Sequence, residues 1–158
     1  MKILITGGCG FIGSILVNQL LELKHHVTVV DTQWFGNFLT KHKNLIIKKK
    51  DFRDLNIEEF NKIDSIIHLA NIANDPGVEL NPLLSWDVNV LGLKELLHNA
   101  IKKKVKQFIF SSSGSVYGIK KEKKVTENLD LVPISIYNKT KMIAERVILS
   151  FNSPTFKT

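Results

Sequence analysis

The chain has 158 residues, 44% of them hydrophobic, with one cysteine and a formal net charge of +7. This length allows one sizeable core and hardly two domains, a single cysteine excludes an internal disulfide, and no apolar run is long enough to cross a bilayer. The lysine runs lack interleaved aromatic residues, which favours a solvated face over a nucleic-acid surface. We therefore expect a cytoplasmic protein with no nucleic-acid partner, no membrane partner and no metal site.

The first element is a short strand that leads through a glycine-rich turn into a helix. Lys2 to Thr6 is apolar and β-branched, as a buried strand would be, and Ser14 to Lys24 carries apolar residues at roughly helical spacing. The glycines of "ITGGCGFIG" lie between the two. They also argue against a signal peptide, because a secretory signal needs an unbroken apolar helix. We expect Cys9, inside the turn, to be a small residue that fits there.

Each part of this turn has a mechanical use in binding a dinucleotide. Gly7 permits the tight turn, Gly10 lets the backbone approach a pyrophosphate, and Gly13 lets the helix pack close to the strand. The helix N-terminus offers unpaired N–H groups to the phosphates. The next strand candidate, "HVTVVD", ends at Asp31, where a carboxylate can bind both ribose hydroxyls and would repel a 2′-phosphate. The sequence therefore predicts a bound dinucleotide, NAD rather than NADP.

Strand and helix candidates alternate along the rest of the chain. The strand candidates are Leu45 to Lys49, Ser65 to Ala70 and Gln107 to Ser111. The helix candidates are Ile57 to Lys62, Leu83 to Lys104 and Ile136 to Phe151. The alternation predicts an α/β fold with a doubly wound, Rossmann-type parallel sheet. The long helix is entered near Pro82, and its expected apolar face consists of Val88, Leu91, Leu93, Leu96, Leu97 and Ile101.

Two later stretches carry candidate chemistry. The strand in "QFIFSSSGSVYG" delivers serines to its carboxyl end, where open parallel sheets bind ligands. In "YNKTK", Tyr137 and Lys141 are four residues apart and share one face of a helix. An ammonium one turn away, together with a positive nicotinamide ring, would favour the tyrosine phenolate. Such a pair on an exposed helix is usually without function, but the dinucleotide turn and the serines favour a reactive tyrosine.

Taken together, these motifs resemble the extended short-chain dehydrogenase/reductase family, the NAD-dependent nucleotide-sugar epimerases and dehydratases. "TGGCGFIG" is similar to the family's cofactor loop, "DFRD" to its adenine segment, and "IIHLA", "NVLG", "SSSGSVYG" and "PISIYNKTK" to later motifs. The resemblance implies catalytic roles for Ser113, Tyr137 and Lys141. It implies cofactor contacts from these two last residues and from Gly7, Gly10, Phe11, Ile12, Gly13, Asp31, Asp51, Phe52, Ala70 and Asn89.

The resemblance also implies a reaction on a nucleotide-sugar substrate. Tyr137 would remove a hydroxyl proton while hydride passes to NAD, Ser113 would bind the same oxygen, and Lys141 would hold the nicotinamide ribose. The resembling dehydratases place an Asp-Glu pair after the catalytic Thr, and decarboxylases tend to carry the glutamate. Here Gly114 and Ser115 stand in those positions, and neither can do acid-base chemistry.

Several functions stay open at this point. The serine-rich stretch is most similar to the UDP-glucose 4-epimerases, so we expect a 4-epimerase, with a reductase or dehydratase of the family as an alternative. "NIANDPGVELNP", near the expected substrate, departs from the epimerase pattern. The sequence is also compatible with a non-catalytic NAD-binding module, with a truncated remnant, and with an interaction protein that has lost its chemistry.

Family members continue well beyond the catalytic helix, adding strands and a small domain that grips the nucleotide-sugar. The resemblance therefore implies an NAD-binding Rossmann domain over residues 1–158 that is incomplete at its C-terminus, with the substrate domain absent. The last strand would then be an unpaired edge. The two long helices could pair in a homodimer, although burial against the sheet explains their apolar residues equally well.

Overall fold

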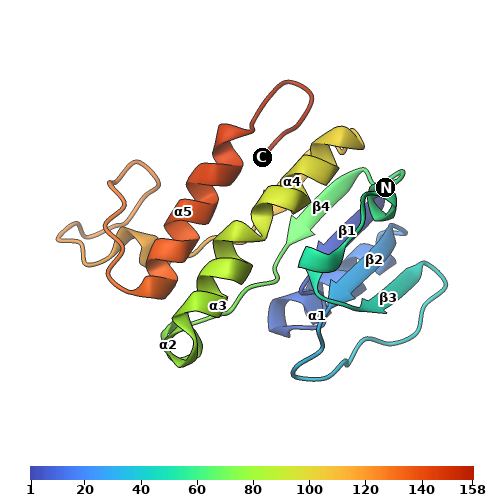
Figure 1. The fold of residues 1–158 in the computed structure, drawn as a ribbon, viewed down its shortest axis with the longest axis horizontal. Helices are drawn as coiled ribbons and strands as arrows, with labels where there is room; N and C mark the ends of the chain where they lie inside the picture. The colour runs from blue at the N-terminus through green and yellow to red at the C-terminus, as the bar shows by residue number, and fades with distance from the viewer.

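Residues 1–158 are described by a computed structural model, in which five parallel strands form one sheet (Figure 1). The strands are β1 (Lys2–Thr6), β2 (His26–Asp31), β3 (Leu45–Lys49), β4 (Ser65–His68) and β5 (Gln107–Phe110). Their order in the sheet is β3-β2-β1-β4-β5. The chain moves outward from β1 to β3 and then crosses back to the other side of β1. This reversal between β1 and β4 is the point at which open α/β sheets bind ligands, and the predicted Rossmann-type sheet is confirmed.

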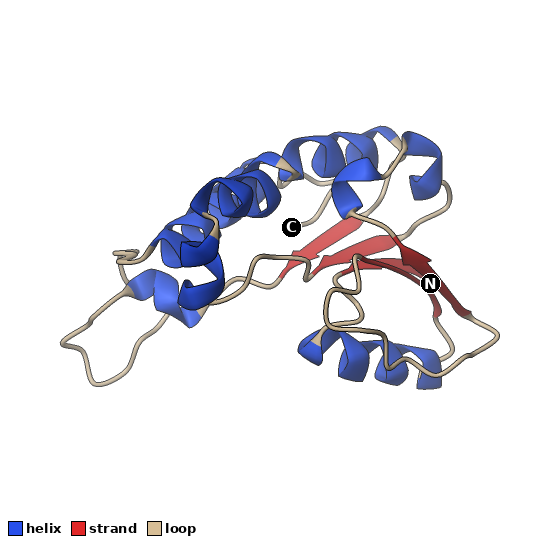
Figure 2. Cartoon of the chain, turned by 60° about the horizontal axis from the view of Figure 1, so that its bottom comes forward, coloured by secondary structure: helices blue, strands red, loops and turns tan.

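Helices cover both faces of the sheet. Figure 2 shows α1 (Phe11–Glu22) alone on one face, and the remaining helices on the other. Those are α3 (Pro82–Trp86), α4 (Leu93–Lys102) and α5 (Ile136–Ser150), with the short α2 (Asp75–Leu80) leading into them. The larger of two apolar clusters packs beneath α4 and α5, and the smaller one lies beneath α1. Three single-turn 3-10 helices complete the fold, at Phe52–Asp54, Ile57–Phe60 and Gly114–Tyr117.

The helix expected from Leu83 to Lys104 is not continuous. A π-helical turn at Asp87–Leu91 separates α3 from α4, and Gly92 follows it. A Cβ on Gly92 would lie 2.9 Å from the Arg53 side chain and 3.0 Å from the Phe52 ring, so the wide turn brings the helix backbone against these residues. The extra residue of a π turn also shifts the helical phase. Leu91, expected on the apolar face, is accordingly 64% exposed, and Ile101 at the far end is 40% exposed.

Other boundaries differ by smaller amounts. The first helix begins at Phe11, directly after the glycine turn, and not at Ser14. The segment expected to be helical from Ile57 to Lys62 is a single 3-10 turn. Helix α2 was not predicted, because its sequence has no helical periodicity. The Asn74 side chain caps this helix by accepting the Gly77 N–H at 3.0 Å.

The segment after α5 returns along β5. The Phe108 N–H donates to the Lys157 carbonyl at 2.7 Å, and the Lys157 N–H donates to the Lys106 carbonyl at 2.9 Å. The edge of β5, expected to be unpaired, is therefore partly covered. None of the helices combines the length and apolar character needed to cross a membrane. No three His, Cys, Asp or Glu side chains lie close enough together to hold a metal ion.

Glu59 lies in the 3-10 turn Ile57–Phe60 and pairs with two lysines at the end of β3, which gives a first prediction. Its carboxylate accepts hydrogen bonds from Lys48 and Lys50 at 2.8 Å each and from the Asn56 N–H at 3.0 Å. Burial alone would raise the Glu59 pKa, but these donors overcome it and lower the pKa from 4.5 to about 2. Because the folded pKa is the lower one, the resulting stabilisation is present above pH 4.5 and is lost as the pH falls toward 2.

We expect Glu59→Gln to lower the free energy of unfolding at pH 7 by about 1 to 2 kcal/mol, a figure discounted for the partial exposure of both lysines. Urea denaturation at pH 7 and pH 3 measures it, and the difference between variant and wild type should shrink at pH 3. Glu58→Gln, which removes an exposed carboxylate paired with Lys103 at the surface, is the comparison and should cost less than Glu59→Gln. An equal loss for Glu59→Gln at both pH values would contradict the prediction.

Candidate functional site

A cavity of about 450 Å³ opens at the carboxyl ends of the central strands. The register pairs Thr6 of β1 with Val30 of β2 and with His68 of β4, so the loops after these strands leave the sheet at the same edge. Most residues predicted to contact the cofactor line this cavity, namely Gly7, Gly10, Phe11, Ile12, Gly13, Asp31, Asp51, Phe52 and Ala70. The cavity therefore joins the glycine turn, the β2 end and the adenine segment in one place.

The glycine turn is built so that backbone packs directly on backbone. Gly7 has φ +76°, and a Cβ there would lie 2.5 Å from the Ala70 nitrogen. A Cβ on Gly13 would lie 2.6 Å from the Gly7 carbonyl oxygen and from Gly8 Cα. No side chain caps the N-terminus of α1, which leaves its first N–H groups available to an anion.

Asp31 holds the turn and the following loop together. Its Oδ2 accepts the Cys9 N–H at 2.9 Å, and its Oδ1 accepts the Gln33 N–H at 2.7 Å. The neighbouring Cys9 is buried, and its pKa is raised to about 11 by burial and by the Asp31 charge. The thiol is therefore neutral, consistent with the expected packing role of Cys9.

The far wall of the cavity comes from the segment after β3. The Asp51 carboxylate accepts two hydrogen bonds from the Arg53 guanidinium, at 3.0 and 2.7 Å. These hydrogen bonds are the main cause of the lowered pKa of Asp51. Phe52 is buried and meets the His68 ring edge-on, with ring centroids 4.9 Å apart. His68 itself bonds Thr6 at 2.6 Å, and burial lowers its pKa to about 3. Neutral aromatic side chains therefore pack behind this end of the cavity.

Ser113, Tyr137 and Lys141 lie around the end of β5. Ser113 caps the following 3-10 turn, accepting the Ser115 N–H at 3.2 Å, and its hydroxyl lies 2.6 Å from that of Ser115. Tyr137 is in the first turn of α5, which Ser135 caps. Lys141 is buried; its Nζ donates to the Ser111 carbonyl at 2.7 Å and lies 4.6 Å from the Phe110 ring centroid. Since Ser111 also lines the cavity, this lysine connects α5 to the cavity wall.

Burial is the main influence on the pKa of Tyr137 in the protein alone. Burial raises it above 10, the Ser113 hydroxyl lowers it, and the Asp75 carboxylate raises it. The Lys141 ammonium is 6.0 Å from the tyrosine ring centroid and is directed at Ser111, so its expected lowering of the tyrosine pKa does not prevail in this structure. Burial lowers the pKa of Lys141 to about 8.

Asn89 lies in the π turn between α3 and α4. It is fully buried and outside the cavity lining. Its Oδ1 accepts the Ile72 N–H at 2.8 Å, and its Nδ2 donates to the Ile72 carbonyl at 3.1 Å and to Thr140 at 3.2 Å. Through these bonds, Asn89 holds the loop after β4 against α5.

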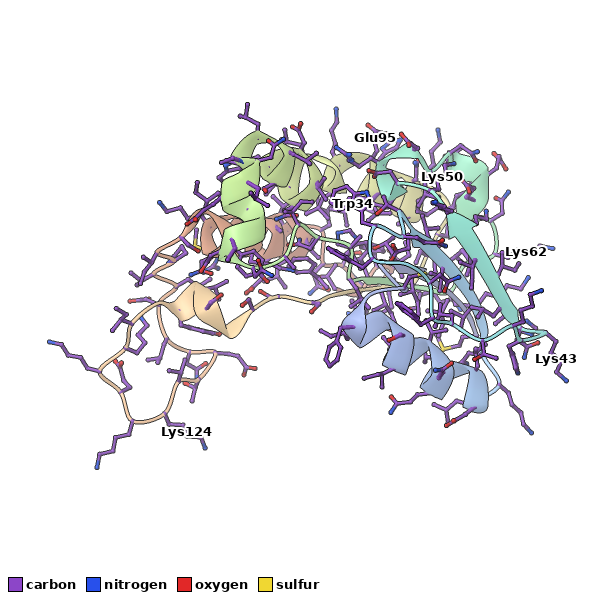
Figure 3. All side chains as sticks on the ribbon, turned by 90° about the horizontal axis from the view of Figure 1, so that it is seen from below. Trp34, Lys43, Lys50, Lys62, Glu95 and Lys124 are labelled. Carbon is purple, nitrogen blue, oxygen red and sulfur yellow. The ribbon has the colours of Figure 1, made fainter.

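Several cavity residues were missed by sequence reasoning. Trp34, Phe35 and Lys50 line it from the loops after β2 and β3, and Figure 3 shows Trp34 and Lys50 at the same end of the molecule. Asn71 also lines it, and its buried side-chain amide has no hydrogen-bond partner in the protein. Their sequence neighbours were the available signal, since Trp34 comes shortly after Asp31 and Asn71 directly follows Ala70.

Comparison with known proteins places this geometry in a family. The model of the NAD dependent epimerase/dehydratase family matches residues 3–155. A curated UDP-glucose 4-epimerase of Lactobacillus helveticus is 34% identical over 157 residues, which cover 94% of this chain and 46% of that protein.

Solved structures agree. A UDP-N-acetylglucosamine 4-epimerase of Methanobrevibacter ruminantium, in complex with UDP-N-acetylmuramic acid, has a TM-score of 0.90 at 32% identity, over 98% of this chain and 51% of that one. A UDP-glucose-4-epimerase of Stenotrophomonas maltophila with bound NAD has a TM-score of 0.87 at 26% identity, over 95% and 48%. The chain thus spans about half the length of these relatives. It belongs to the NAD-dependent epimerase/dehydratase family.

Proposed function

We propose that the chain is the cofactor-binding and catalytic part of an NAD-dependent nucleotide-sugar 4-epimerase. The observation that carries the proposal is that Lys141 bonds to the carbonyl of Ser111, a residue of the cavity wall, from the same helix that presents Tyr137. The proposed base Tyr137 and its partner Ser113 are thereby connected to the dinucleotide-sized cavity through the residues that follow β5. Nucleotide-sugar epimerases with this fold at 26 to 34% identity support the same assignment.

The residues present fit NAD. The glycines let the turn pack tightly beneath α1, the uncapped helix N-terminus suits a pyrophosphate, and the Asn71 amide lacks a partner inside the protein. Asp31 would accept hydrogen bonds from the adenosine ribose. NAD would supply a hydride acceptor that takes hydrogen from the sugar carbon and later returns it.

The protein's own groups would handle the proton. We propose that Tyr137 removes the proton from the sugar 4-hydroxyl as the carbon is oxidised, and that Ser113 donates a hydrogen bond to the same oxygen. Lys141 would hold the nicotinamide ribose and keep the Tyr137 side of α5 in place. Asn89 would act as a positioning residue by fixing the loop after β4.

The two residues after Ser113 favour epimerisation over dehydration. Elimination of water from the keto sugar needs a general acid-base group, and Gly114 and Ser115 provide none. Ser115 instead bonds back to Ser113, which orients that hydroxyl. The ketone formed at C4 would therefore be reduced again from its other face.

We also propose that residues 1–158 form an NAD-binding domain and that most substrate contacts come from outside them, because the relatives are about twice as long. A homodimer would then form by pairing of α4 and α5 of one copy with those of a second copy.

Incubation of the protein isolated from its own cell with UDP-glucose and NAD tests the reaction. We expect UDP-galactose by NMR; a dehydrated keto-deoxy sugar as product would favour a dehydratase instead.

Asp31→Ala gives a prediction for the cofactor. We expect NAD binding to weaken about tenfold or more and the discrimination against NADP to relax, because the carboxylate both accepts ribose hydrogen bonds and repels a 2′-phosphate. Calorimetric titration with NAD and NADP measures both affinities. An unchanged ratio of the two would show that the ribose is recognised by other residues.

A further inference from the structure

We propose that Trp34 and Phe35 form an aromatic cover over the adenine end of the cavity; this inference rests on the proposed NAD-binding function. Both side chains line the cavity from the loop after β2. Asp31, the proposed ribose acceptor, precedes them by a few residues, and Asp51 and Phe52 line the wall contributed by the segment after β3. An adenine attached to a ribose at Asp31 would lie beside these rings.

The backbone is shaped to present these two rings. Gln33 to Gly36 form a tight turn in which the Gly36 N–H donates to the Gln33 carbonyl at 3.0 Å, so Trp34 and Phe35 occupy its two central positions. Gln33 has φ +58°, which a side chain-bearing residue rarely adopts, and its N–H is held by the Asp31 carboxylate at 2.7 Å. The proposed ribose acceptor therefore also anchors the turn.

The two rings leave a large apolar surface open to solvent beside the cavity. Trp34 is 62% exposed and Phe35 is 88% exposed, although both are large apolar residues. A flat aromatic base would remove this surface from water and stack on the indole, an interaction that contributes strongly to base binding elsewhere. Phe38, in the same loop, is 80% exposed but lies outside the cavity lining, which makes it a matched control.

Charge favours an adenosine without a 2′-phosphate under this cover. Lys50 also lines the cavity and could in principle attract a phosphate. Its ammonium is instead held by Glu59 at 2.8 Å. With that cation neutralised and Asp31 close by, an aromatic and uncharged base is the group that suits this end of the cavity.

Calorimetry with AMP and NAD on four variants tests the cover. We expect Trp34→Ala to weaken both ligands about tenfold, Phe35→Ala to weaken them less, and Phe38→Ala to leave both unchanged. Trp34→Phe should restore most of the affinity, because it keeps an aromatic face. Equal AMP binding by wild type and Trp34→Ala would overturn the proposal and would favour the loop as a docking surface for another protein.

A second measurement does not depend on the stability of the alanine variants. Trp34 and Trp86 are the two tryptophans, and Trp86 is outside the cavity lining. In Trp86→Phe, AMP should quench the fluorescence of Trp34 saturably, and AMP bound without quenching would overturn the cover. If wild type binds NAD and Tyr137 is needed for activity while Trp34→Ala changes nothing, the cover fails and the proposed function stands. If wild type binds neither NAD nor AMP, both fail.

Discussion

Replacing Tyr137 by phenylalanine is expected to lower the rate of sugar oxidation by about 10²- to 10⁴-fold, the range in which a positioned general base contributes. The hydroxyl lost is the group that would take the sugar proton, and neither Ser113 nor a protonated Lys141 can replace it. The affinity for NAD should change by less than about twofold, since phenylalanine keeps the ring that packs in the first turn of α5. Lower activity with preserved cofactor binding therefore separates chemistry from folding.

Tyr117→Phe is the matched control, because it removes the one other tyrosine hydroxyl of the chain, at the end of the 3-10 turn that follows Ser113. Activity is measured by the conversion of UDP-glucose at saturating NAD, and cofactor affinity by calorimetry. Tyr117→Phe should retain wild-type turnover. Activity near the wild-type level in Tyr137→Phe would remove Tyr137 from the proposed role and leave the base to be sought elsewhere.

Gly13→Ala is expected to disrupt the glycine turn and the seating of α1 on it. The added methyl would come within 2.6 Å of the Gly7 carbonyl oxygen and of Gly8 Cα, both of which are backbone atoms fixed by the turn. Helix α1 must then move away from β1, which costs about 1 to 3 kcal/mol or more by overpacking. Since the same helix presents its N-terminus to the pyrophosphate, we expect NAD affinity to fall about 100-fold.

Gly114→Ala provides the control for that effect, because a Cβ there meets nothing within 4 Å. Urea denaturation measures stability and a titration with NADH measures affinity for both variants. Gly114→Ala should match wild type in the two measurements. A Gly13→Ala protein as stable as wild type, with unchanged NADH binding, would contradict the close packing of the turn.

The glycine turn could be predicted from sequence because all its determinants are local. Glycine spacing, the apolar runs on both sides and the acid at the end of β2 lie within the first 31 residues, and the structure brings them to one cavity. The parallel orientation of the strands followed from the alternation of strands and helices. Residues joined by short, regular segments are therefore placed well by pattern.

The features that sequence reasoning missed depend on packing between distant segments. The π turn and the inward amide of Asn89 follow from contacts with Ile72 and Thr140, far apart along the chain. The upward pKa shift of Tyr137 depends on burial and on Asp75, the first residue of α2, in a segment that departs from the epimerase pattern. Trp34 was missed because an exposed aromatic residue in a loop has no periodicity to assign it to a site.

The hydrogen at C4 of the sugar offers the most direct test of the proposed chemistry. UDP-glucose with deuterium at C4 would be incubated in ordinary water with NAD and the protein isolated from its own cell. We predict UDP-galactose that keeps the deuterium at C4, because the hydride that leaves to NAD is the one that returns. UDP-galactose with solvent hydrogen at C4, or a dehydrated keto sugar as the product, would contradict the assignment of this site to nucleotide-sugar epimerisation by hydride return.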